Sequence, residues 1–516
     1  MISLDGHSLN IGTLINASRM KEPVELSQKA IQSIEKSQQR LNAIIAQGKP
    51  VYGLNTGFGI FADRSITPDE RQQLNRNLIL SHAVGTGEEL PEEIVRAAML
   101  IRANTLSKGF SGISRELVQT LLDMLNRGVI PVIYSKGSLG SSGDLCMLAQ
   151  MALVATRMDG EKDSESSLAY YNNAKTSGRE AMQQAGIQRL VLTNKDGLAL
   201  INGATFSTAI LALTAFDSAY LCRLADLAAS LSFEALLART DALHPQIHSA
   251  RGLKGQIDSA ANIADMLQGS TFVNSHPHVQ DAYSLRCAPQ VHGAVRDTLD
   301  FVLDTLSAEI NAATDNPLIV KDGLAISGGN FHGEAVGMGA DYLGIALSEL
   351  AGISERRTFR LMDKNLNHGL PAMLVGNADK EGLNSGIMML QYTAASLALE
   401  NQTLSSPDSV RSLPTSANQE DFNANAANAA NHARQILENA CRIITIEMYA
   451  ACRAIDLRKR ENGALQLGQS TGKAYQMIRA GVPFQNGDAY WKEEVDRLHE
   501  FIFRQDSFRE TYSGGI

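Results

Sequence analysis

The chain has 516 residues, and its 46 Lys and Arg against 55 Asp and Glu give a formal net charge of −9. This length exceeds the usual size of one domain and predicts two or more structural regions with a large core. The acidic balance argues against nucleic acid or an anionic membrane as a partner, because both attract basic patches.

Other features of the composition predict a soluble, cytoplasmic protein. The five cysteines are scattered without paired spacing, which favours reduced thiols over a disulfide framework. The N-terminal residues lack a basic start followed by an apolar run, so we expect no signal peptide. No apolar stretch reaches about 18 residues without a polar interruption, so we expect no membrane span.

The predicted elements are mainly helical. The first helix is expected at residues 22–47, where apolar side chains recur three and four positions apart. Glycine-rich segments then alternate with helices up to about residue 200, as in a globular head whose loops carry chemistry. Long helical patterns follow at residues 205–237, 333–362, 382–404 and 423–458. Such helices bury more than one side, which predicts a bundle that also packs against other subunits. We therefore divide the chain into residues 1–204 and 205–516.

The most informative segment is the loop at residues 137–145, which reads GSLGSSGDL. At its centre stands Ser141-Ser142-Gly143, a tripeptide that can cyclise in a fold that bends it. The amide nitrogen of Gly143 would add to the carbonyl carbon of Ser141, and loss of two waters would consume the hydroxyl of Ser142. Glycine suits this step because it lacks Cβ and tolerates the bent backbone. Taken alone, such a loop is more often an ordinary tight turn.

Six further blocks accompany this loop: residues 52–59 (YGLNTGFG), 77–87 (NLILSHAVGTG), 280–286 (QDAYSLR), 311–317 (NAATDNP), 327–333 (SGGNFHG) and 418–421 (NQED). In their order and approximate spacing, the chain resembles the histidine and aromatic amino acid ammonia-lyases. The resemblance implies a mainly α fold of the fumarase/aspartase-like superfamily, with a globular N-terminal head that carries catalytic loops and a long central helical bundle. It also implies a homotetramer in which three subunits build each active site.

The resemblance implies that Ser141-Ser142-Gly143 forms a methylidene-imidazolone ring and that no external cofactor is needed. The family's tyrosine at the position of Tyr52 takes a β-proton from the substrate, which requires dipoles or positive charge that favour a phenolate. Tyr283 and Glu420 complete the expected catalytic set. By residue type alone, Tyr52 would be a packing residue with a satisfied hydroxyl.

The resemblance also implies how the amino acid is held. The family's arginine at the position of Arg286 pairs with the substrate carboxylate, in a bidentate geometry that Lys cannot copy. Asn202 would bond the same carboxylate or the oxygen of the electrophile. Gln280 lines the pocket, and Phe331 packs near the carboxylate end. Without the resemblance, an arginine in a helical stretch is most often a surface ion-pair partner.

Two residues predict which side chain is bound. In the histidine-specific branch, a His and a Glu at the positions of His82 and Glu420 contact the imidazole of the substrate. A carboxylate that faces an imidazole N–H would reject a phenyl ring, because its buried charge would stay unpaired. The predicted partner is therefore a small imidazole amino acid, with L-histidine as the preferred substrate.

The chain departs from the family near the electrophile. Ser141 stands where Ala is usual, and Cys146, Gln150 and Phe422 also replace the family's residues. Only the backbone carbonyl of Ser141 would enter the ring, so the ring stays compatible with the sequence. Three activities remain open: ammonia release from histidine to give urocanate, ring-independent release of trimethylamine from a histidine betaine, and an aminomutase reaction. A scaffold without activity is the least favoured interpretation.

His276 and His278 flank Pro277 close to Asp281, and such a pair can bind a metal. No Cys or further His stands at helical or hairpin spacing, so we predict a loop and no metal site.

Overall fold

The structure, a computed structural model, describes residues 1–48, 51–52, 56–57, 64, 66–67 and 70–512. The backbone packs into two compact units, and both are discontinuous in sequence. Unit 1 comprises Met1–Leu213, Leu303–Asp341 and Pro407–His432, and unit 2 comprises Thr214–Val302, Tyr342–Ser406 and Ala433–Ile516. The first predicted region, residues 1–204, lies within unit 1, which also takes residues from the second predicted region.

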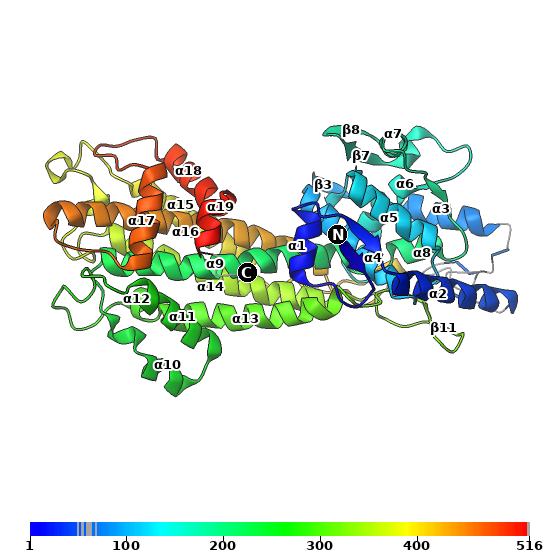
Figure 1. The fold of residues 1–516 in the computed structure, drawn as a ribbon, viewed down its shortest axis with the longest axis horizontal. Coiled ribbons are helices and arrows are strands. Elements are labelled where there is room, and N and C mark those ends of the chain that lie inside the picture. The colour runs from blue at the N-terminus through cyan, green and yellow to red at the C-terminus, as the bar shows by residue number, and fades with distance from the viewer. Residues whose placement is uncertain (49–50, 53–55, 58–63, 65, 68–69, 513–516) are drawn as a thin grey trace. The chain divides into compact units, whose positions relative to one another are not determined.

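Unit 1 is built around helix α4 (Glu92–Ser107), whose side chains are all buried from Ile94 onwards. Helices α1 and α5 pack against it (Figure 1). Two arginines are buried on α4, and both donate to main-chain carbonyls: Arg96 Nη2 to Ala17 O at 2.9 Å and Arg102 Nη1 to Asn202 O at 2.6 Å. The other helices of unit 1 are α1 (Ile11–Ser18), α2 (Gln28–Ala46), α3 (Arg71–His82), α5 (Arg115–Arg127), α6 (Leu145–Ala155), α7 (Gly178–Gln184) and α8 (Asp196–Ile201).

The strands described in unit 1 are short and form small separate sheets. Two pairs are parallel: β1 (Ile2–Leu4) with β2 (Val24–Leu26), and β6 (Thr156–Arg157) with β9 (Leu190–Val191). The antiparallel sheets are β3 (Thr86–Glu89) with β5 (Tyr134–Lys136), β4 (Ile130–Pro131) with β7 (Leu168–Tyr171) and β8 (Ala174–Ser177), and β10 (Leu318–Ile319) with β11 (Ala325–Ile326). The strands lie in the segments before and between the helices. The core of unit 1 is centred on the buried helix α4.

The helix predicted at residues 22–47 begins later than expected. Val24 and Leu26 are both buried, and their spacing of two is that of a strand, which pairs with Ile2–Leu4. Ser27 then caps α2, because its side-chain oxygen accepts from Ala30 N at 3.1 Å. The prediction was wrong for the first six residues and right for the rest of the helix.

The long helices of the second half agree with prediction in three cases. They are α9 (Thr205–Ala235), α14 (Glu334–Met362) and α16 (Ala426–Glu461). The fourth, α15 (Met388–Leu404), starts later than predicted, and Gly386 just before it has φ +61°, which a right-handed helix does not accommodate. A fifth long helix, α13 (Ala288–Glu309), was not predicted.

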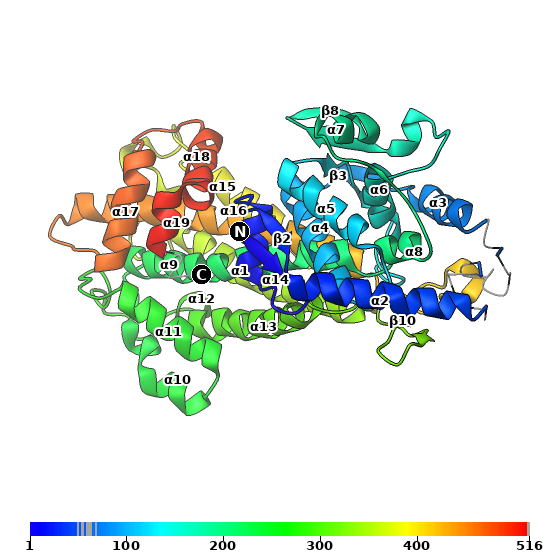
Figure 2. The same ribbon diagram turned by 45° about the vertical axis from the view of Figure 1, so that its right-hand side comes forward.

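The remaining helices of unit 2 are short. In Figure 2, α10 lies beside α11. These helices are α10 (Pro245–Arg251), α11 (Lys254–Met266), α12 (Tyr283–Arg286), α17 (Gln469–Gly481), α18 (Trp491–Arg504) and α19 (Asp506–Tyr512). The 3₁₀ turns of the two units are η3 (Asp163–Ser166), η4 (Thr240–Leu243), η5 (Ala372–Leu374), η6 (Ala378–Lys380) and η7 (Ser416–Asn418).

Within the described residues, α9 is the one helix long and apolar enough to cross a membrane by length and composition. The mean hydropathy of its most apolar 18-residue window is 1.3, and 83% of that window is buried in the fold. Burial of this kind is typical of a core helix.

Buried charges join three long helices of unit 2. Glu447 on α16 accepts from Arg357 Nε at 2.5 Å and from Arg357 Nη2 at 2.9 Å. The same carboxylate accepts from Ser232 Oγ on α9 at 2.7 Å and from Ser354 Oγ on α14 at 2.6 Å. Because both oxygens have several donors, the buried charge is compensated.

Candidate active site

A cavity of about 1150 Å³ opens in unit 1, and it collects residues from distant parts of the sequence. Helix α3, the loop before α6, the turn between α8 and α9, and segments near residues 330 and 420 all contribute to its wall. The predicted site residues that line it are Tyr52, His82, Ser141, Ser142, Asn202, Phe331 and Glu420. Of the block at residues 52–59, only residues 52, 56 and 57 are among the described residues, and the rest of the block lies outside them.

Close approach of two backbones bends the loop with the Ser-Ser-Gly tripeptide. Gly143 has φ +84°, and a Cβ there would lie 2.1 Å from Gly203 N. Asp144 N donates to Gly203 O at 2.8 Å, which ties this loop to the start of α9. Only glycine fits at residue 143, since any side chain would collide with the facing backbone.

Hydrogen bonds to the side chain of Asp144 hold the loop in place. Its buried carboxylate accepts from Ser138 Oγ at 2.7 Å, from Ser207 N at 2.8 Å and from Ser207 Oγ at 2.8 Å. Burial raises the pKa of Asp144, while the hydrogen bonds from Ser207 and Ser138 oppose that shift. These bonds join the two ends of the loop, so the conformation of the tripeptide depends on Asp144.

The two serines of the tripeptide have different partners. Ser142 Oγ donates to Glu420 Oε1 at 2.8 Å, and Ser142 O accepts from Asn202 Nδ2 at 2.8 Å. Ser141 is buried, and its Oγ accepts from Ala424 N at 2.8 Å. The hydroxyl that would leave on cyclisation therefore faces the cavity carboxylate, while the other hydroxyl is held by the backbone.

A buried arginine holds the backbone of Asn202 in place. The main-chain carbonyl oxygen of Asn202 accepts from Arg102 Nη1 at 2.6 Å. Burial lowers the pKa of Arg102 to about 10, and the charge of Asp315 acts against that shift. Asn202 Oδ1 is buried, and no donor reaches it from the residues that the structure describes. A buried acceptor without a donor at a cavity wall is a place for a ligand donor.

Glu420 sits after a strained turn. Ser416, Ala417 and Asn418 all have positive φ, at 49°, 51° and 67°. Glu420 Oε2 accepts from Thr415 Oγ1 at 2.9 Å, which orients the carboxylate toward the tripeptide. Left-handed conformations at three successive residues other than glycine are costly and occur mainly at functional sites.

His82 is the last residue of α3 and lines the cavity. Its Nδ1 lies 2.7 Å from Leu78 O, a carbonyl that can only accept, so Nδ1 carries the hydrogen. In the neutral ring, Nε2 is then an acceptor. A half-buried imidazole with a defined acceptor suits recognition of a ligand N–H.

The predicted residues Gln280, Tyr283 and Arg286 lie in unit 2 and are not among the residues that line the cavity. They form their own group around α12, where the guanidinium of Arg286 lies 4.5 Å from the ring centre of Tyr283. With its amide turned so that Oε1 faces Arg286, Gln280 accepts from the guanidinium at 3.1 Å. Tyr283 is 70% exposed, so its ring is available for contact from outside unit 2.

Sequence reasoning missed the residues that orient the site. Arg102, Asp144 and Thr415 do not line the cavity, but each bonds a residue that does or fixes the loop beside it. Asp144 carried a signal, because it follows the tripeptide directly. Arg102 and Thr415 carried none, since their partners are set by packing.

The long helices and the residues gathered at this cavity agree with a carbon–nitrogen lyase, and comparison with known proteins supports that class of enzyme. The chain belongs to the aromatic amino acid lyase family, whose model matches residues 9–480.

Three relatives illustrate the similarity. Histidine ammonia-lyase from Caldanaerobacter subterraneus subsp. tengcongensis is 46% identical over 484 residues, which cover 93% of this chain and 92% of that protein. The crystal structure of histidine ammonia-lyase from Trypanosoma cruzi matches with a TM-score of 0.88 and 36% identity, over 99% of this chain and 94% of that one. The ergothionase from Treponema denticola matches with a TM-score of 0.90 and 30% identity, over 100% of both chains.

These relatives confirm three predictions. The mainly α fold, the family and the class of enzyme, a carbon–nitrogen lyase of the ammonia-lyase type, are all as the sequence motifs predicted. The roles of the individual site residues stay predictions.

Proposed function

We propose that this enzyme eliminates ammonia from L-histidine to give urocanate. The observation that carries the proposal is the pairing of Glu420 with Ser142 at the cavity wall, at 2.8 Å, with His82 on the same cavity. The carboxylate can accept the single N–H of a neutral substrate imidazole, and an imidazole acceptor beside it adds a partner for the second N–H of an imidazolium. The 46% identity to a histidine ammonia-lyase over nearly the whole chain supports this choice of substrate.

We further propose that Ser141-Ser142-Gly143 carries the methylidene-imidazolone, formed from the chain itself. The residues present fit that group: Gly143 has no space for a Cβ, the loop is bent by its contact with Gly203, and Asn202 Nδ2 already donates to Ser142 O at 2.8 Å. Ser141 fits as well as alanine, because its hydroxyl is bonded to the backbone of Ala424. The group would supply an electrophile that makes the amine a better leaving group and the β-proton more acidic.

The chain's own residues would bind the substrate and move its proton. Glu420 accepts the imidazole N–H once the Ser142 hydroxyl has gone, and His82 Nε2 borders the same space. Tyr52 Oη takes the β-proton, and Asn202 Oδ1 accepts from the substrate, since it lacks another donor among the described groups. Phe331 supplies an apolar contact that excludes water.

Arg286, Gln280 and Tyr283 would bind the carboxylate of the substrate. Because these residues belong to unit 2 and Tyr283 is largely exposed, we propose that they act on the cavity of another subunit. This arrangement requires an oligomer with shared active sites, and the homotetramer that the family resemblance implies is the assembly that we propose.

A second candidate activity has support of its own. The similarity to an ergothionase, with a TM-score of 0.90, favours a substrate that carries its own leaving group. A quaternary ammonium cannot add to an electrophile, so release of trimethylamine from a histidine betaine would depend on acid–base residues alone.

One experiment separates these activities. Purified enzyme is given L-histidine or its trimethyl betaine, and urocanate, the released amine and any β-histidine are identified. Ammonia and urocanate from histidine are expected, and Ser142→Ala should abolish both. Ser141→Ala is the matched control, since only the carbonyl of this residue enters the ring. It should keep activity and an intact mass lighter by two waters than the sequence predicts. Trimethylamine release that survives Ser142→Ala would favour the second activity, and β-histidine would favour a mutase.

A further inference from the structure

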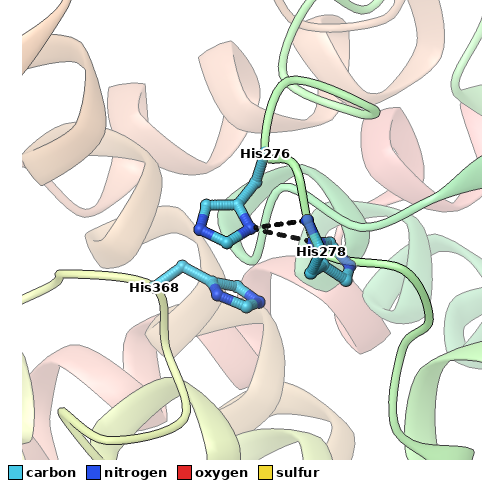
Figure 3. Close-up of side chains that lie close together, drawn as sticks. All are labelled: His276, His278 and His368. Carbon is cyan, nitrogen blue, oxygen red and sulfur yellow. Dashed lines mark hydrogen bonds between the residues drawn. The ribbon is translucent and has the colours of Figure 1, made fainter.

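Three histidines meet in unit 2, outside the cavity described above. His276 and His278 lie in the segment between α11 and α12, and His368 lies in the segment after α14 (Figure 3). The ring centres are 4.1 Å apart for His276 and His368, 4.8 Å for His278 and His368, and 5.1 Å for His276 and His278. One nitrogen from each ring lies within 4.8 Å of the others. The third histidine could not be predicted from the sequence, because it lies about 90 residues further along the chain.

The hydrogen bonds leave two nitrogen lone pairs facing each other. His278 Nε2 lies 2.9 Å from Asp281 Oδ1, so Nε2 carries a hydrogen and Nδ1 of a neutral ring has a lone pair. His276 Nδ1 accepts from the backbone N–H of His278 at 3.3 Å and therefore also has a lone pair. These two Nδ1 atoms are 2.9 Å apart. Two lone pairs at this distance repel, so the neutral rings need a shared cation: either a proton, which would make His278 Nδ1 a donor to His276 Nδ1, or a metal ion.

The geometry suits a transition metal. A tetrahedral ion with metal–nitrogen bonds of about 2.0–2.1 Å holds its ligand nitrogens about 3.3 Å apart. Two of the nitrogens, His276 Nδ1 and His278 Nδ1, are already 2.9 Å apart, and the third lies within 4.8 Å, so ion binding would have to bring the ring of His368 closer to the other two. Three neutral imidazoles are a ligand set that zinc, cobalt, nickel and copper accept, with one position left open.

Asp281 supports the cluster as a carboxylate behind a ligating histidine does. Its Oδ1 accepts from His278 Nε2, and its Oδ2 accepts from Arg239 N at 2.7 Å. A carboxylate in this position orients the ring and raises the basicity of its other nitrogen. Asp281 O also accepts from Arg286 Nε at 2.9 Å, which connects the cluster to α12.

An arginine also lies beside the third histidine. Arg458 donates to main-chain carbonyl groups, including His368 O at 2.9 Å. A positive charge near the cluster opposes a bound cation and would lower the affinity of the site.

We propose that His276, His278 and His368 bind one divalent transition-metal ion, such as Zn²⁺ or Co²⁺. The ion would cross-link the segment before α12 to the segment after α14. These histidines do not line the cavity, and the test of the metal site measures binding of the ion without any substrate.

The test uses full-length enzyme without an affinity tag, treated with a chelator and then dialysed against Co²⁺ or Zn²⁺. We expect one ion per chain and a visible cobalt spectrum without a thiolate charge-transfer band, because the ligands are nitrogens. Excess Zn²⁺ should raise the thermal midpoint of unfolding. Hydrogen exchange of residues 276–286 should slow when the metal is bound.

Variants identify the ligands. His368→Asn keeps the left-handed conformation at φ +56°, which Asn tolerates, and should weaken binding by about 100-fold or more. Asp281→Asn should weaken it by about 10–100-fold. His244→Asn is the matched control: it removes an imidazole that caps α10, Asn caps equally well, and binding should stay unchanged.

Several results would overturn the proposal. They are absence of bound metal in the wild type, equal binding by wild type and His368→Asn, and a cobalt spectrum with thiolate ligation. If His368→Asn does not fold, His276→Gln gives the same comparison from the other segment.

Discussion

The cavity of unit 1 and the ionic cluster around Glu447 in unit 2 both bring polar side chains together. They differ in how many hydrogen-bond partners those side chains have. Glu447 has donors on both oxygens, from Arg357 and from two serines on neighbouring helices. In the cavity, Asn202 Oδ1 meets no donor among the described residues, and the Ser142–Glu420 bond lies at the wall. A saturated cluster holds helices together, whereas unsatisfied groups at a cavity are available to a ligand.

Removal of one charge from the saturated cluster should have the largest effect on stability. We expect Glu447→Gln to lower the free energy of unfolding by about 3–5 kcal/mol, because it leaves the Arg357 guanidinium buried without a counter-charge. Denaturant unfolding of the two proteins measures this difference. Glu438→Gln on the same helix is the control, since Glu438 is 65% exposed in its pair with Arg434 and should cost about 1 kcal/mol or less. Equal losses in both variants would refute the role of burial.

The comparison also explains what the sequence could predict. The long helices α9, α14 and α16 were predictable because their apolar periodicity is local. Sequence motifs identified three residues that line the cavity, namely Tyr52, His82 and Glu420. Such motifs can be recognised in the sequence because each is a short run of neighbouring residues.

Other features depend on contacts between distant residues. Arg102 reaches Asn202 across 100 positions, and His368 meets His276 only after folding. Strand β2 was missed because Val24 and Leu26 also fit a helical period. No local pattern distinguishes such partners, so only the three-dimensional structure identifies them.

The carboxylate of the cavity should matter for catalysis and little for stability. We expect Glu420→Gln to lower kcat/KM for histidine by about 10²-fold, equivalent to about 2.7 kcal/mol, because a charge-assisted bond to the imidazole is lost. The free energy of unfolding should change by less than in Glu447→Gln, since Glu420 is only half-buried. Steady-state kinetics with histidine and phenylalanine measure the effect. The ratio of kcat/KM for histidine over phenylalanine should fall in the variant, and an unchanged ratio would remove Glu420 from substrate recognition.

The smallest expected effect is on the pH dependence of stability. It should come from His499 of unit 2, where burial and nearby positive charge oppose protonation of the imidazole. Burial lowers the pKa of His499 to about 4, and Arg442 and Arg504 act in the same direction. The folded state therefore binds this proton less readily than the unfolded state, whose histidine has a pKa near 6.5. The associated stability is present above about pH 6.5 and is lost as the pH falls toward about 4.

Between pH 7 and pH 5 we expect His499 to contribute a loss of about 1 kcal/mol, a value reduced for its partial exposure to water. His499→Gln stays neutral over this range and can still bond Thr445 Oγ1, which lies 3.2 Å from His499 Nδ1. The variant should therefore lose less stability on acidification than the wild type, measured by denaturant unfolding at both pH values. Identical losses in the two proteins would mean that the pKa of His499 is the same in the folded and the unfolded state, so that burial and the two arginines do not act on this imidazole. A larger loss in the wild type would show that unit 2 opposes an uncompensated positive charge, in contrast to the compensated pair of Arg357 and Glu447.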